Sequence, residues 1–136
     1  MTEPEINAEV TARLVVSEGD LASALASPDS DPFPAVLATS RMIALMELAS
    51  ARLLSAHLQR GELSVGVVIE VSHTAPTPPG AIVTATARYV GREGKLFLFE
   101  VVACDPGGEI GRGSHKRAVI TTERLLEGAQ RRTGTA

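Results

Sequence analysis

Residues 36–58 read VLATSRMIALMELASARLLSAHL, and this stretch decides the fold of the 136-residue chain. It is rich in Ala, Leu and Met and contains neither Gly nor Pro, a composition that favours a helix. At 1.5 Å per residue such a helix would be roughly 35 Å long, enough to cross a small domain. Apolar residues occupy most of its circumference, so we expect it to be buried rather than to lie on a surface.

The charged residues of this helix fall into two groups. Arg41 and Arg52 lie on one narrow stripe when residues are placed about 100° apart, and we interpret this stripe as the solvent-facing edge. Glu47 lies off the stripe, among apolar residues, and has no basic residue three or four positions away. Its carboxylate must therefore find a partner on a distant element, as in a structural salt bridge, or lose hydration of its charge through burial.

Length and composition bound the class of protein. We expect a single domain over residues 1–136, with loose tails at residues 1–7 and from about 128 to 136. The net charge of −3 and the absence of a basic block argue against a nucleic-acid partner. The polar N-terminus does not resemble a signal peptide, and no apolar run reaches membrane-spanning length. We therefore expect a soluble cytoplasmic protein without a membrane partner.

The single cysteine, Cys104, excludes an internal disulfide and offers no metal cluster. We expect no metal site and no cofactor.

Five other segments are predicted strands because they alternate or are rich in β-branched residues. They are residues 9–16, 63–73, 82–90, 95–104 and 109–122. The connector 17–34 contains DLASALAS, which can form a short helical turn or a mobile flap. The proline-rich TAPTPPG, residues 74–80, is predicted to be a stiff loop.

The order of these elements indicates the architecture. A strand, a long helix and four strands joined by short turns predict an antiparallel sheet. One apolar helix covering one face of that sheet gives an α+β domain. A five-stranded antiparallel sheet wrapped around one long central helix is the hotdog fold. Such a sheet has an open edge that pairing between two subunits would remove, so a homodimer is expected.

Three separated blocks carry a family resemblance. They are TSRMIALMELA at 39–49, VSHTAPTPPG at 71–80 and GRGSHKRAVI at 111–120. In this order and spacing they resemble the hotdog-fold acyl-CoA thioesterases, specifically the fluoroacetyl-CoA thioesterase group. The similarity extends from the first strand to about Glu123. It implies an enzyme that hydrolyses an acyl-CoA thioester, with coenzyme A as part of the substrate and not as a cofactor.

The resemblance makes Thr39, Glu47 and His73 the catalytic residues. Thioester hydrolysis needs a nucleophile or an activated water, a proton shuttle, and donors for the developing oxyanion. A threonine hydroxyl beside a helix N-terminus, a carboxylate and a histidine suit these functions. Thr39 and Glu47 would lie about 12 Å apart along a straight helix. We therefore expect either a non-helical position for Thr39 or a site at the dimer interface that combines residues of both subunits.

The resemblance also implies substrate-binding residues. It places Gly66 against the acyl group, Arg117 near the active site and Phe33 at the gate of the acyl pocket. Arg117 could hold Glu47 or bind a phosphate of coenzyme A. The rest of the acyl pocket is expected to be lined by the helix and by three residues of one strand, Val67, Ile69 and Val71.

Structural alternatives stand beside these roles. Thr39 can be a simple helix cap, and His73 can be a strand-end histidine that bonds the following loop. The proline loop can be a rigid hairpin, and His115 is assigned a structural role. For the whole chain, the alternative to a hydrolase of a short or small acyl-CoA is a non-catalytic module that binds acyl-CoA or another small ligand. A hotdog dehydratase is a weaker third interpretation, because its local motif is not found.

Overall fold

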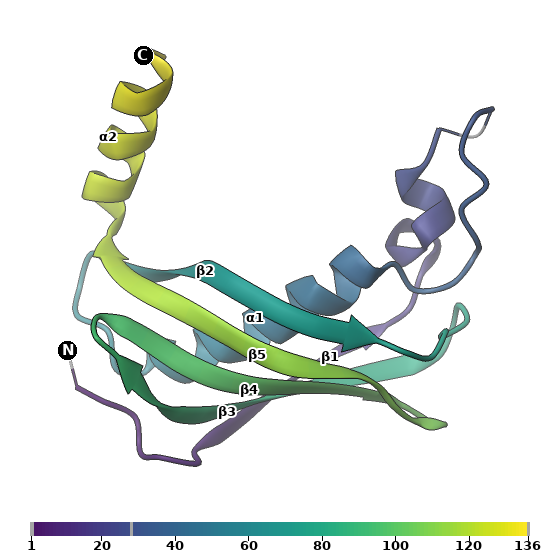
Figure 1. Ribbon diagram of the computed structural model, residues 1–136, viewed down its shortest axis with the longest axis horizontal. Coiled ribbons are helices and arrows are strands. Elements are labelled where there is room, and N and C mark those ends of the chain that lie inside the picture. The colour runs from purple at the N-terminus through teal and green to yellow at the C-terminus, as the bar shows by residue number, and fades with distance from the viewer. Residues whose placement is uncertain (1, 28, 136) are drawn as a thin grey trace.

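The computed structural model describes residues 2–27 and 29–135 as a curled sheet around one helix (Figure 1). The sheet is antiparallel, with strand order β1-β3-β4-β5-β2. Its strands are β1 (Glu9–Val15), β2 (Glu62–His73), β3 (Ile82–Glu93), β4 (Leu96–Asp105) and β5 (Gly108–Thr121). Helix α1 (Thr39–Ser55) lies against it. The predicted α+β hotdog architecture is therefore confirmed.

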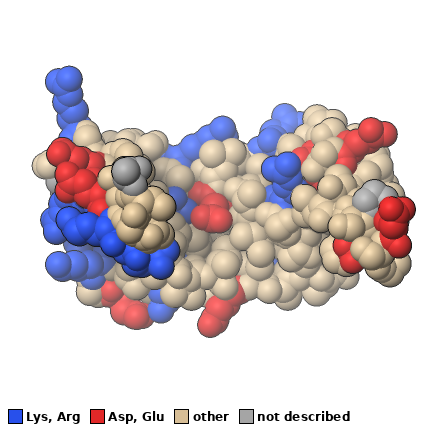
Figure 2. Space-filling model, turned by 90° about the horizontal axis from the view of Figure 1, so that it is seen from above, with Lys and Arg blue, Asp and Glu red and all other residues tan. Residues whose placement is uncertain are grey.

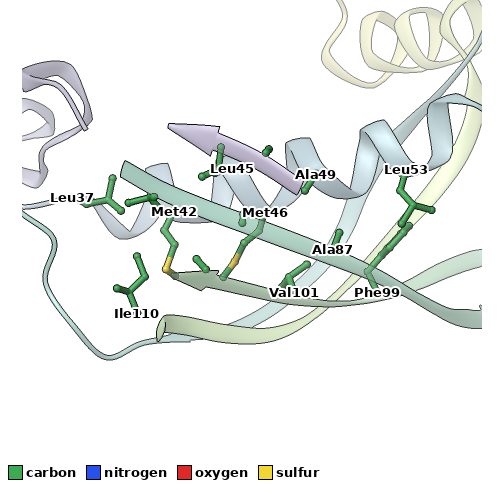
Figure 3. Close-up of a cluster of buried hydrophobic side chains, with 14 of the residues drawn as sticks. Leu37, Met42, Leu45, Met46, Ala49, Leu53, Ala87, Phe99, Val101 and Ile110 are labelled. Carbon is green, nitrogen blue, oxygen red and sulfur yellow. The ribbon is translucent and has the colours of Figure 1, made fainter. Parts of the chain in front are cut away.

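The core lies between one side of α1 and the inner face of the sheet (Figure 3). Six apolar helix residues are buried, namely Met42, Leu45, Met46, Ala49, Leu53 and Leu54. Alternate residues of β3 are completely buried, as in any strand with one face on the core: Val83, Ala85, Ala87 and Tyr89. Arg41 and Arg52 are exposed, which confirms the solvent-facing edge of the helix. Burial of each larger side chain stabilises the fold by about 1.5–3 kcal/mol.

Helix α1 is shorter than predicted, because tertiary hydrogen bonds hold its approach extended. The N–H of Leu37 donates to the carbonyl of Thr77 at 2.9 Å, and the N–H of Ala38 donates to the carbonyl of Asp20 at 2.9 Å. Ala38 has φ −68° and ψ 141°, so the first helical residue is Thr39. Local sequence could not show this, because both acceptors belong to other parts of the chain.

The connection between β2 and β3 differs from the hairpin that was expected. β2 pairs with β5 and lies at an edge of the sheet, whereas β3 lies between β1 and β4. The proline loop at residues 74–80 therefore carries the chain from the edge strand to a strand three places away. Local β propensity identifies a strand but does not select its partner, and this is why the expectation was wrong.

The segment before α1 contains two short 3-10 helices, η1 (Glu18–Asp20) and η2 (Ala22–Leu25), which confirms the predicted helical turn. We call residues 17–27 and 29–38 the flap. The carboxylate of Asp20 accepts hydrogen bonds from the N–H and the hydroxyl of Ser17, both at 2.9 Å. Together with the Asp20 carbonyl at Ala38, these bonds tie the base of the flap to the start of α1.

Both expected loose tails make specific contacts within the described residues, and only Met1 and Ala136 of these tails lie outside them. Helix α2 (Thr122–Thr133) occupies the C-terminal region, starting with the hydroxyl of Thr121 as acceptor from the N–H of Arg124. At the other end, the N–H of Asn7 donates to the carbonyl of Tyr89 at 2.8 Å, which holds the chain beside β3. Composition alone suggested disorder because neither segment contributes much to the core. In the described part of the chain, no helix is both long and apolar enough to cross a membrane.

Candidate active site

One half of the candidate site is a hydrogen bond between Thr39 and His73. Thr39 is the first residue of α1 and His73 is the last residue of β2, and Oγ1 lies 2.8 Å from Nδ1. The Thr39 hydroxyl does not cap the helix, whose N-cap position is Ala38. His73 likewise uses Nδ1 for Thr39 and not for the following loop. Neither structural alternative therefore describes the contacts of these two side chains.

The proline loop supports this pair from one side. An open pocket of about 250 Å³ is lined by His73, Thr74, Ala75 and Pro76. The next residue, Thr77, is fully buried, and its hydroxyl donates to Oδ2 of Asp105 at 2.7 Å. Because the Thr77 carbonyl also accepts from the approach to α1, the loop joins the strand that carries His73 to the helix that carries Thr39.

The other half of the site is an ion pair between Glu47 and Arg117. Nη1 of Arg117 lies 3.3 Å from Oε2 of Glu47. The Arg117 side chain is only 6% exposed, whereas that of Glu47 is 43% exposed. Arg117 also donates from Nε to the hydroxyl of Ser64 and from Nη2 to its carbonyl, both at 2.9 Å. Glu47 thus has the distant partner that its position on the helix required.

Burial lowers the pKa of Arg117, and the neighbouring Glu47 carboxylate opposes that shift. The guanidinium therefore depends on Glu47 and Ser64 to compensate for lost hydration. Removing one partner would leave a buried charge incompletely satisfied.

His115 fixes one further N–H of Arg117. Nδ1 of His115 lies 2.8 Å from the carbonyl of Val68, so Nδ1 carries the proton and donates. Nε2 is then free to accept from Nη1 of Arg117 at 3.1 Å. Burial lowers the pKa of His115, and Arg117 lowers it further, although the Val68 carbonyl and Glu47 act in the opposite direction. The imidazole is therefore held neutral beside a cation.

The burial of neutral His115 predicts how the stability of the fold depends on pH. Because the pKa of His115 is lowered from its ordinary 6.5 on folding, the unfolded chain binds the proton more readily. The contribution of neutral His115 to the free energy of unfolding is complete above about pH 6.5 and is lost as the pH falls below that value. The urea midpoint should therefore fall more steeply between about pH 7.5 and 5.5 in the native protein than in His115→Gln. If the urea midpoint changed with pH equally in the native protein and in His115→Gln, the role of His115 in this pH dependence would be contradicted.

Gly66 allows the carboxylate to lie directly against β2. A Cβ atom at this position would be 2.7 Å from Oε2 of Glu47 and 3.1 Å from Cε1 of His115. The pairing of β2 with β5 is irregular between Gly66 and Val68, where a bulge inserts one residue. The bulge turns Val67 outward, where it is 52% exposed in the single chain, and its place in the acyl pocket stays a prediction because that pocket is expected at the subunit boundary.

The structure therefore brings the predicted residues together in two groups. Thr39 contacts His73, and Glu47 contacts Arg117 and lies against Gly66. The two groups are separated by about 12 Å of helix, because Thr39 is helical and does not precede α1. Of the two alternatives, a non-helical position for Thr39 is therefore excluded, and the site shared by two subunits stays a prediction.

Phe33, expected at the gate of the acyl pocket, lies on the flap and is 53% exposed. Among the described residues, no three His, Cys, Asp or Glu side chains gather as a metal ion would require.

Sequence reasoning did not single out Ser64, which holds the buried guanidinium with two of its atoms. A signal was present, because Ser64 precedes Gly66 by two residues and therefore shares its face of β2. His115 was assigned a structural role, yet it bonds Arg117 directly.

A sheet curled around one helix, with a Thr–His pair at the helix start and a half-exposed glutamate paired with a buried arginine further along it, defines a hotdog-fold protein of the thioesterase class. Residues 16–123 match the family described as fluoroacetyl-CoA-specific thioesterase. The fluoroacetyl-CoA thioesterase of Streptantibioticus cattleyicolor is 44% identical over 107 residues, which cover 79% of this chain and 77% of that protein. The chain belongs to the fluoroacetyl-CoA-specific thioesterase family.

Solved structures show the same relationship. A structure of the fluoroacetyl-CoA thioesterase FlK is 38% identical with a TM-score of 0.89, covering 96% of this chain and 98% of that one. A hypothetical protein of Thermus thermophilus, a thioesterase superfamily member, is 25% identical with a TM-score of 0.88 and coverage of 98% and 96%. The hotdog fold and the family resemblance are therefore confirmed over nearly the whole chain.

Proposed function

We propose that this protein hydrolyses a short-chain or small acyl-CoA thioester to the free acid and coenzyme A. The observation that carries the proposal is the 2.8 Å bond between Thr39 and His73, two residues that are 34 positions apart. A helix cap or a strand-end histidine would not need this contact. The named activity of the relatives supports the same reaction class.

The relatives also support two of the proposed site residues. FlK has been solved as threonine variants with acetyl-CoA and with fluoroacetate, and as a phenylalanine variant with fluoroacetate and coenzyme A. The two substituted positions are six residues apart, the same spacing that separates Phe33 from Thr39 here. We infer that Thr39 contacts the reacting thioester and that Phe33 contacts the acyl group.

Each catalytic side chain has a part in the reaction. Thr39 and the free N–H groups of the first turn of α1 can hold the carbonyl oxygen as it gains negative charge. The Glu47 carboxylate either attacks the carbonyl carbon or removes a proton from the attacking water. The C–S bond then breaks, and His73 can deliver the proton that the departing sulfur takes up. Where Glu47 is the attacking group, water then hydrolyses the anhydride formed between Glu47 and the acyl group, which releases the acid and restores the carboxylate. Water is the only other reactant, and no cofactor is required.

Glu47 is too far from Thr39 along one helix, so the proposed site combines two subunits. Nε2 of His73 is buried and has no hydrogen-bond partner among the described residues. A two-fold axis perpendicular to the sheet near the middle of β2 would pair two β2 edges antiparallel and remove the open edge. The Thr39–His73 pair of one subunit could then lie near Glu47 of the other. A dimer structure with these groups far from the subunit boundary would refute this arrangement.

The experiment is to measure thiol release from a panel of acyl-CoAs, from acetyl and fluoroacetyl to longer and aromatic chains. Release from the small esters would support the hydrolase. Binding of the esters without any release would favour the non-catalytic binding module. Similar efficiencies for acetyl-CoA and fluoroacetyl-CoA would exclude a fluoroacetyl preference but not the reaction itself. The cytoplasmic location stays a prediction.

A further inference from the structure

Two segments project from the body of the protein on the same side. In Figure 1, α2 and the flap both rise beyond the β2 edge, at opposite ends of the sheet. α2 begins beside the start of β2, where the N–H of Thr122 donates to the carbonyl of Gly61 at 2.9 Å. The flap returns to the body beside the loop that follows β2, through the bond between Leu37 and Thr77. The open edge therefore lies between two arms.

Within the described part of one chain, helix α2 has few contacts that would stabilise it. None of its residues is buried, and it contacts the body mainly through β5. Leu126 is 57% exposed on this helix. With 12 residues, α2 is at the length at which an isolated helix is only marginally stable in water. Its amphipathic sequence indicates that its apolar side packs against another surface.

The flap is complementary to α2 in charge and in apolar character. Residues 17–38 contain no Lys or Arg, and three of their four acidic residues are exposed: Glu18, Asp29 and Asp31. α2 carries three arginines and two glutamates, and its C-terminal end is basic because Arg131 and Arg132 lie there. Figure 2 looks onto the side of the molecule from which both arms project: at the α2 end basic side chains predominate, with acidic ones among them, and at the opposite end the outermost charged side chains are acidic. Leu25 and Phe33 of the flap are 54% and 53% exposed.

We propose that α2 of one copy packs on the flap of a second copy of this chain. A two-fold axis perpendicular to the sheet through β2 exchanges the two ends of the molecule, so it sets the basic arm of each copy beside the acidic arm of the other. Both arms extend past the edge that this pairing would cover. The inference rests on the dimer included in the proposed function, and it adds a contact that edge pairing alone does not require.

This contact would act on the site. The flap carries Phe33, and its base is bonded to the residues that immediately precede Thr39. A partner helix seated on the flap would therefore restrict movement of Phe33 relative to Thr39 and His73. Each active site would then be covered by the C-terminal helix of the opposite subunit.

Cross-linking of the full chain tests the proposal. In a Cys104→Ser background, Gln130→Cys on α2 is combined with Ala24→Cys on the flap, both at exposed positions. Because the two arms lie at opposite ends of one chain, a disulfide between them must join two chains (Figure 1). Mild oxidation should give a covalent dimer in high yield. The control combines Gln130→Cys with Glu109→Cys, near the β4–β5 turn, and should remain largely uncross-linked.

A charge exchange provides an independent measurement. Arg131→Glu with Arg132→Glu should weaken self-association about tenfold, as should Asp29→Lys with Asp31→Lys, and the combined variant should recover most of the loss. Recovery together with selective cross-linking supports the proposal. If the protein is a dimer by mass but shows neither the recovery nor the selective cross-linking, the α2 contact is overturned and the shared active site still stands. A monomer that still releases thiol overturns both the contact and the shared site, but not the hydrolase.

Discussion

Glu47→Gln is expected to lower kcat/KM for the preferred acyl-CoA by about a thousandfold or more, as loss of a carboxylate base or nucleophile usually does. Glutamine keeps the volume of the side chain and can still accept a hydrogen bond from Arg117. It cannot take a proton from water or attack the carbonyl. Binding of the acyl-CoA should remain within a few-fold of the native value, so the loss should appear in kcat.

The control for this variant is Glu9→Gln, which changes an exposed carboxylate of β1, at the opposite edge of the sheet from β2 and outside the candidate site. It should leave thiol release unchanged. The control should unfold at the native urea concentration, whereas Glu47→Gln should unfold at a lower one, because Ser64 and His115 continue to hold Arg117 but its buried charge loses the carboxylate partner. If Glu47→Gln retained more than about a tenth of the native kcat/KM, the chemical role assigned to this carboxylate would be wrong.

Gly113→Ala is expected to produce the largest loss of stability. A Cβ atom at Gly113 would lie 1.9 Å from the carbonyl oxygen of Glu70 and 2.7 Å from the Cα atom of Val71. Both are backbone atoms of β2, the neighbouring strand, so they cannot move aside as a side chain would. Relief requires separating β2 from β5, and we expect a cost of about 3 kcal/mol or more in the free energy of unfolding. Urea denaturation followed by circular dichroism measures it.

Gly128→Ala is the matched control, because a Cβ atom there meets nothing within 4 Å. Gly128 is inside α2, where alanine is the better helix former by up to about 1 kcal/mol. This variant should therefore be neutral or slightly more stable than the native protein. Equal denaturation midpoints for Gly113→Ala and the native protein would show that β2 and β5 are not packed as described.

Much of the fold could be predicted because it follows from local periodicity. The apolar run at 36–58 predicted the central helix, and the alternation at 82–90 predicted the strand whose alternate residues face the core. The helix ends and the partner of β2 could not be predicted. Leu37 and Ala38 remain extended because Thr77 and Asp20 accept from their N–H groups, and these acceptors are remote in sequence.

For the candidate site, too, the residues could be predicted but their contacts could not. Thr39, Glu47 and His73 were identified by their residue types and by the family resemblance. Their contacts depend on how strands and helix are placed, and so does the role of Ser64 in holding Arg117. Local patterns report propensity, whereas these pairings are made across large separations along the chain.

By itself, the sequence determined the elements and the α+β class, because these depend on residue type and short-range periodicity, and its resemblance to the thioesterase family indicated the candidate site residues. The tertiary structure alone decided which of these residues meet. It placed Arg117 beside Glu47, and it inserted the bulge that turns Val67 outward. The physical reason is that one inserted residue reverses the faces of a strand, and its position depends on the register with β5 and not on the residues of β2 alone.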